Sequence, residues 1–110
     1  MAADLTTYRQ AILDIYLRLP DTPRRISRCD LSLVNQLWER NVSLDTLETA
    51  LLLATARRAQ RPPDAMPLGP VRSLHYYIPV IEELIQTPLS QGQAYLDYLR
   101  RKVILPPRPS

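Results

Sequence analysis

Apolar residues recur at helical spacing along most of this chain, and the apolar–polar alternation of a β-strand is missing. In the first segment they lie mostly three or four residues apart, at Leu5, Tyr8, Ile12, Ile15, Tyr16 and Leu19. Pro20 follows the last of them, so we predict an amphipathic helix over residues 4–19 that ends before the proline. The chain has two glycines and no Asn-Gly or Asp-Gly pair, which leaves little for tight hairpins.

A second helix is predicted from about residue 30 to about residue 40. Asp30 is the residue type that caps a helix N-terminus, and Val34, Leu37 and Trp38 would face inward. Asn41 suits the left-handed backbone position that follows many helices.

A third helix is predicted from Leu44 to about Gln60. Ser43 would cap it, and Asp45 lies in its first turn, where the helix dipole favours an anion. Its apolar positions form an unusually wide arc, made of Leu44, Leu47, Ala50, Leu51, Leu52, Leu53 and Ala54. An arc this wide indicates a central helix with neighbours on several sides. The proline-rich segment 61–70 that follows is predicted to be a loop.

The fourth segment, residues 71–86, contains a conflict at Pro79. An interior proline costs a helix about 3 kcal/mol, yet the apolar stripe runs through it, at Leu74, Tyr77, Ile78, Ile81, Leu84 and Ile85. We therefore predict one helix that is kinked at Pro79 and capped by Ser73. The alternative is a short turn followed by a new helix with Pro79 in its first turn.

A last helix is predicted from about Pro88 to Val103, with Thr87 as its cap and Tyr95, Leu99 and Val103 on its buried side. The predicted fold is all-α, a single compact bundle of about five helices with the third at its centre and the fourth kinked. Residues 1–103 would form one domain, and the proline-rich residues 104–110 an extended tail.

Composition excludes several classes of protein. The chain has 110 residues, enough for one core, and its single cysteine, Cys29, cannot form an intrachain disulfide. No stretch is long and apolar enough for a membrane span, and the start lacks a secretory signal, so we expect a soluble, cytoplasmic protein with no membrane partner.

No metal or cofactor motif is present, and neither a Cys29–His75 dyad nor the adjacent Glu82 and Glu83 form a plausible catalytic pair. We expect neither an enzyme nor a cofactor.

Arginine dominates the cations. Thirteen of the 14 are arginine and the other is Lys102, with a net charge of +3. The arginine fork grips phosphate and carboxylate better than lysine does. A GC-rich coding sequence would produce the same bias, and cations at helix C-termini are favoured by the dipole without any partner. Tyr76, next to the inward-facing Tyr77, could stack on an unpaired base or be an ordinary surface aromatic. The candidate nucleic-acid-binding residues are Arg24, Arg25, Arg28, Arg57, Arg58, Arg61, Arg72, Tyr76, Arg100, Arg101 and Lys102.

Residues 30–87 resemble helical replication-accessory domains of the DnaD-like kind, found in bacterial and phage replisome organisers. The segments 41–51 and 73–85 carry the resemblance, with Tyr77 and Ile81 at the family's Tyr-xxx-Ile spacing and Ile85 where an aromatic residue is usual. The resemblance implies DNA binding, contact with initiator or helicase-loading proteins, and a replication or mobile-element role.

Two functions are therefore expected. The first is a small non-enzymatic accessory protein that contacts the phosphates of nucleic acid, DNA rather than RNA, through its arginine groups. The rival is a helical protein–protein adaptor or small subunit of a larger complex, or a homo-oligomer, because residues such as Leu52, Leu53, Val80 and Tyr98 exceed what one stripe per helix can bury. Arginines gathered on one face favour the first function, and arginines around an apolar patch favour the second.

Overall fold

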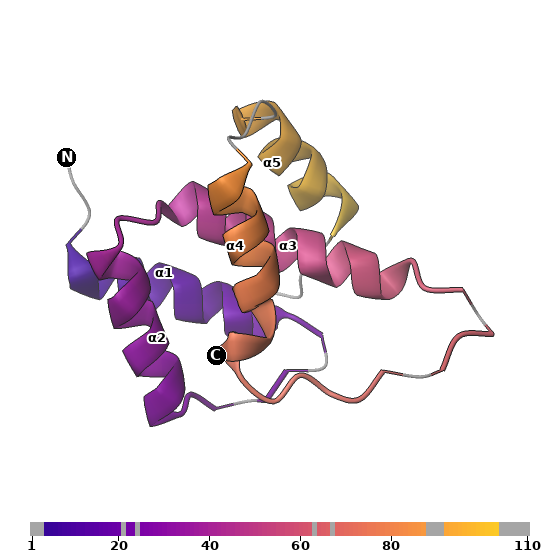
Figure 1. Ribbon diagram of the computed structural model, residues 1–110, viewed down its shortest axis with the longest axis horizontal. Coiled ribbons are helices and arrows are strands. Elements are labelled where there is room, and N and C mark those ends of the chain that lie inside the picture. The colour runs from indigo at the N-terminus through magenta and orange to yellow at the C-terminus, as the bar shows by residue number, and fades with distance from the viewer. Residues whose placement is uncertain are drawn as a thin grey trace.

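The computed structural model describes residues 4–20, 22–23, 25–62, 64–66, 68–87 and 92–103, and only the main chain of Gln93. Within these residues the chain forms five α-helices and one 3₁₀ turn (Figure 1). In chain order they are α1 (Leu5–Arg18), α2 (Arg28–Glu39), α3 (Leu44–Ala59), η1 (Leu74–Tyr77), α4 (Ile78–Gln86) and α5 (Gly92–Lys102). The described residues contain no strand, so the predicted all-α bundle is confirmed.

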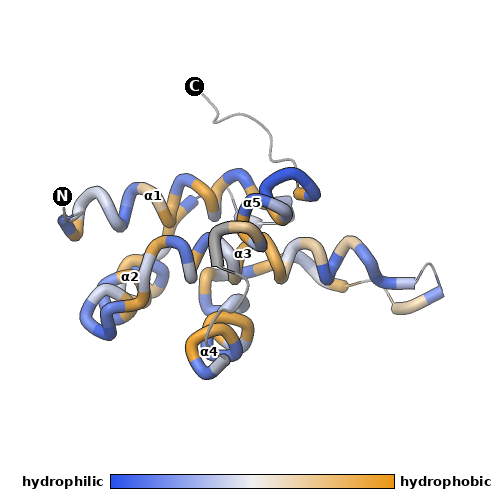
Figure 2. Tube along the Cα trace, turned by 90° about the horizontal axis from the view of Figure 1, so that it is seen from above, coloured by the Kyte–Doolittle hydropathy of each residue, from blue (hydrophilic) through white to orange (hydrophobic). Residues whose placement is uncertain are grey.

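Helix α3 is the centre of the bundle, as its wide apolar arc predicts. All residues from Thr49 to Ala56 are buried, and α1, α4 and α5 all pack on this helix (Figure 2). Ser43 caps it by accepting the Thr46 amide at 3.1 Å. Just before it, Asn41 has a φ of 60°, the left-handed conformation expected there.

The start of α2 differs from the prediction. Ser27, not Asp30, is the N-cap, and the helix begins at Arg28. The Ser27 hydroxyl accepts the Asp30 amide at 3.1 Å, and the Asp30 carboxylate accepts the Ser27 amide at 3.0 Å. This reciprocal capping box uses an acidic residue at the third helical position, so Asp30 lies in the first turn of the helix. Val34 and Leu37 are buried and Trp38 is half-buried, as predicted.

The predicted kink in the fourth segment is wrong, and the alternative is correct. Residues 74–77 form the 3₁₀ turn η1, and a separate helix α4 begins at Ile78 with Pro79 in its first turn. Pro79 has no amide hydrogen to donate to the His75 carbonyl, and the Ile78 amide donates to it instead. This hydrogen bond spans three residues instead of the four of an α-helix, which is the pattern of a 3₁₀ turn. Ser73 caps η1 by accepting the His75 amide at 3.2 Å.

The end of the chain is described only in part. Thr87 is the C-cap of α4, its amide donating to the Glu83 carbonyl at 3.0 Å. The predicted start near Pro88 and the predicted tail 104–110 lie outside the described residues. In α5, Leu99 is buried as predicted, and Leu96, which the predicted stripe leaves out, is buried too. None of the described helices is both long and apolar enough to cross a membrane.

Candidate nucleic-acid interface

Three arginines join neighbouring helices through carboxylates. Arg57 at the end of α3 donates to both carboxylate oxygens of Glu83 in α4, at 3.0 and 2.8 Å. Arg100 in α5 donates to both oxygens of Glu48 in α3, each at 2.6 Å. Arg40, the C-cap of α2, donates to Glu82 in α4 at 2.6 Å. The two-pronged contacts need the arginine fork, so part of the arginine bias has a structural use.

These ion pairs change the titration of their acidic partners. The hydrogen bond from Arg57 lowers the pKa of Glu83 below its ordinary value, and the hydrogen bond from Arg40 lowers the pKa of Glu82. Both carboxylates are therefore held ionised and matched to a cation. The charge of these arginines is already balanced within the molecule, which lowers the attraction they offer to a phosphate.

Two further arginines hold the loop that follows α3. Arg58 donates to the Tyr76 hydroxyl and to the Gly69 carbonyl, both at 3.0 Å, and its guanidinium lies 5.3 Å from the centre of the Tyr76 ring. Arg61 donates to the Met66 carbonyl at 2.6 Å. Arg58 and Arg61 therefore tie the end of α3 to the loop, and Arg58 also ties it to η1.

A groove lies where the end of α3, this loop and the start of α4 meet. Its volume is about 370 Å³. The aliphatic residues that line it are Ala54, Leu68, Pro79 and Val80, and the polar ones are Arg57, Arg58, Arg61 and Tyr76. We call it the α3–α4 groove.

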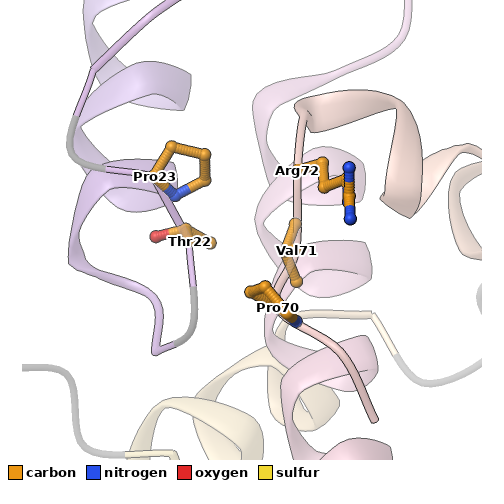
Figure 3. Close-up of a pocket in the computed structure, with 5 residues that line it drawn as sticks. All are labelled: Thr22, Pro23, Pro70, Val71 and Arg72. Atoms are coloured by element: carbon orange, nitrogen blue, oxygen red, sulfur yellow. The ribbon is translucent and has the colours of Figure 1, made fainter.

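Arg25 and Arg28 lie in a different place, in and just before the first turn of α2, which packs beside η1. The segments that lead into α2 and into η1 both run along the lower side of the molecule in Figure 1. Thr22 and Pro23 from one, and Pro70, Val71 and Arg72 from the other, line a pocket of about 560 Å³ (Figure 3). Farther along, the Leu74 amide donates to the buried Asp30 carboxylate at 2.9 Å. This bond fixes the start of η1 against the first turn of α2.

Three exposed arginines lie along this side of the molecule: Arg25, Arg28 and Arg72. Arg28 is two residues before Asp30 and Arg72 is two residues before Leu74, so the Asp30–Leu74 bond brings them to the same junction. In Figure 3 the Arg72 guanidinium points away from Pro23 and the pocket. None of the three makes a side-chain hydrogen bond or ion pair with the part of the chain that the structure describes. We call them the basic edge.

The remaining candidates are scattered. Arg24 lies outside the described residues. Arg101 and Lys102 are exposed at the end of α5, where Lys102 contacts the Tyr98 hydroxyl at 3.4 Å. The start of α2, the end of α3 and helix α5 lie in different parts of Figure 1. Tyr76 keeps 42 % of its surface exposed, and its ring stands edge-on to Tyr77.

Sequence reasoning gave Asp30 a helix cap but missed its bond to the Leu74 amide, which joins α2 to η1, and it missed the acidic partners of Arg40, Arg57 and Arg100. Each of these contacts joins residues at least 26 positions apart, so no helical spacing indicates it. His75 and Cys29 are exposed on different elements, and the described residues contain no group of three or more possible metal ligands.

Comparisons of the chain with protein-family models, with curated proteins and with solved structures find no match. The resemblance to DnaD-like domains therefore stays a prediction. Its two marker positions, Tyr77 and Ile81, are buried core residues of η1 and α4, and Ile85 is partly exposed.

Proposed function

We propose that this protein is a small nucleic-acid-binding accessory protein whose basic edge contacts the phosphate backbone. The observation that carries the proposal is that Arg25, Arg28 and Arg72 are exposed on the two segments that meet at the Asp30–Leu74 bond, and have no acidic partner in the described chain. An arginine in this state offers its full charge and all its donors to a ligand. The net charge of +3 and the sequence position of Arg24 beside Arg25 act in the same direction.

The basic edge suits an extended polyanion better than a single phosphate. Its arginines come from two chain segments and do not converge into the pocket between them, since Arg72 points away from it. A nucleic-acid backbone presents phosphates in a row, which scattered exposed arginines can contact one by one. Such contacts position the ligand without reading its sequence, so we expect little sequence preference.

The bridging arginines have a smaller part in this proposal. Arg57 and Arg100 already bond carboxylates, so a phosphate would have to compete with Glu83 and Glu48. The role of Tyr76 in base stacking stays a prediction, since Arg58 lies over its ring. A DNA ligand and a replication or mobile-element setting rest on the resemblance alone.

The test is a fluorescence anisotropy titration with labelled single-stranded and duplex DNA and with RNA, at low and at moderate salt. Three phosphate contacts on duplex DNA predict an affinity about 40-fold weaker after a fourfold rise in salt concentration. No binding at low salt, or binding that salt does not weaken, would contradict the proposal.

A second function, a protein–protein adaptor, is favoured by one specific observation. Two large side chains that line the α3–α4 groove are exposed, Leu68 by 43 % and Tyr76 by 42 %. Exposed apolar patches with a polar rim mark contact surfaces. The basic edge and the α3–α4 groove use different residues, so one chain can perform both functions.

A further inference from the structure

The α3–α4 groove has the construction of a binding site for a protein segment, and it lies apart from the basic edge. Half of the residues that line it are aliphatic: Ala54 from α3, Leu68 from the loop, and Pro79 and Val80 from α4. Leu68 keeps 43 % of its surface exposed although it borders this groove. Covering these carbons would remove apolar surface from water, which is the main driving force of association.

The walls of the groove are fixed before any partner arrives. Arg57 joins α3 to α4 through Glu83, and Arg58 joins α3 to the Gly69 carbonyl and to Tyr76. Pro79, in the first turn of α4, has a locked backbone angle. A preformed groove lowers the conformational entropy that binding must remove.

The rim of the groove favours an acidic partner. The Arg61 guanidinium is exposed and bonds a main-chain carbonyl, which is neutral, so that bond leaves its positive charge unbalanced. Arg57 and Arg58 also line the groove, and Arg57 pairs with Glu83. Asp64, in the same loop, is exposed and is the acidic residue nearest to Arg61 in the sequence.

The lining also favours protein over nucleic acid as the occupant. An unpaired base binds by stacking on an open aromatic face. Tyr76, the aromatic residue that lines this groove, has Arg58 5.3 Å from its ring centre and stands edge-on to Tyr77. The aliphatic residues of the groove instead match branched apolar side chains, which an amphipathic helix presents at i, i+3, i+4 and i+7.

We propose that the α3–α4 groove binds an acidic, amphipathic helical segment of a partner protein. The apolar side chains of that helix pack on Leu68, Pro79 and Val80, and its carboxylates face Arg61 and its neighbours. This inference does not depend on nucleic-acid binding, because it uses none of Arg25, Arg28 or Arg72.

The probe is a labelled synthetic helix of about four turns, with Leu at the i, i+3, i+4 and i+7 positions and Glu on its flanks. We expect saturable binding, and affinity about tenfold or more weaker when Gln replaces the flanking Glu. Leu68→Asp, on the loop, should weaken binding by a similar factor. Val80→Glu is the second variant, checked by circular dichroism because Val80 is half-buried. The control is the triple variant Arg25→Ala, Arg28→Ala and Arg72→Ala, which should bind the probe like the parent protein.

Each other outcome would overturn the inference. Absence of saturable binding, or equal affinity in Leu68→Asp and the parent, would remove the groove as the site. Oligonucleotide binding that Leu68→Asp abolishes and the triple variant keeps would assign the groove to nucleic acid. A dimer in sedimentation that Leu68→Asp dissociates would assign the groove to a second copy of the chain.

Discussion

The carboxylate of Asp30 bonds the main-chain amide of Leu74, 44 residues further along the chain, at 2.9 Å. Its other oxygen accepts the Ser27 amide at the start of α2, so one side chain caps a helix and anchors the turn before α4. The side chain of Asp30 is buried, with 2 % of the residue exposed. Asp30 thus fixes the place of η1 and, with it, the arginines of the basic edge.

Replacing Asp30 with alanine should lower the free energy of unfolding by about 2–4 kcal/mol, because two amides, one of them buried, lose their acceptor. Asp30→Asn should cost less, since its one amide oxygen can still accept one of them. Urea denaturation measures the free energy of unfolding of both variants. The control is Asp64→Ala, at an exposed residue, whose free energy of unfolding should lie within about 0.5 kcal/mol of the parent. Equal stability of Asp30→Ala and Asp64→Ala would contradict the anchoring role.

Two buried tyrosines should respond in opposite ways to loss of the hydroxyl. Tyr8 donates its hydroxyl to the Val42 carbonyl at 2.7 Å, and Tyr8→Phe should cost about 1 kcal/mol. The buried Tyr16 hydroxyl has no hydrogen-bond partner within the described chain, so Tyr16→Phe should leave stability unchanged or raise it by about 1 kcal/mol. Thermal unfolding of the two variants measures the difference. Two equal losses would show that Tyr16 has a partner in solution.

The same tyrosines predict an alkaline loss of stability. Burial raises the pKa of Tyr8 to about 12, and burial together with the charge of Asp30 raises the pKa of Tyr16 to about 12, from an ordinary value near 10. The unfolded chain releases these protons first, so the stabilisation is complete below about pH 10 and is lost as the pH rises towards 12. The measurement is the free energy of unfolding across this pH range, for the parent and for Tyr16→Phe. The free energy should fall less steeply with pH in Tyr16→Phe, which lacks one of the two phenols. Ionisation of both phenols near pH 10 in the folded protein would contradict this.

Replacing Pro79 with alanine should slightly destabilise the protein. Pro79 is in the first turn of α4, where no intrahelical amide bond is lost, so the main effect is greater freedom of the unfolded chain, about 0.4–1 kcal/mol. A proline inside a continuous helix would give the opposite sign, a gain of about 3 kcal/mol. Chemical denaturation decides between them, with the loop variant Pro62→Ala as control. A marked gain in stability would instead indicate a continuous helix kinked at Pro79.

The helices could be predicted because each has its own periodic pattern and end signals. Ser43 and Asn41 act as their residue types indicate, and the wide arc of α3 locates the centre of the core. The errors fall at Asp30 and Pro79, where two local structures fit the same residues. Asp30 is a good N-cap and an equally good third residue of a capping box. At Pro79 the apolar stripe continues because both η1 and α4 face the core.

The candidate site could be predicted only as a set of residue types. The sequence shows that arginine is abundant, but a bridging arginine such as Arg57 looks the same in sequence as an unpartnered one such as Arg72. What separates them is the position of an acidic residue in another helix, which depends on tertiary packing. The exposed side of the loop at Leu68 likewise depends on how Arg58 and Arg61 hold that loop.

The salt dependence of duplex DNA binding, compared between the parent protein and the triple variant Arg25→Ala, Arg28→Ala and Arg72→Ala, tests the central claim most directly. Each phosphate contact contributes about 0.9 to the slope of log affinity against log salt concentration. The triple variant should therefore have a slope shallower by about 2–3 and weaker binding at low salt, whereas Arg101→Ala, which removes an exposed arginine far along the chain, should keep the slope of the parent. Equal slopes for the parent and the triple variant would contradict the assignment of the basic edge to nucleic acid.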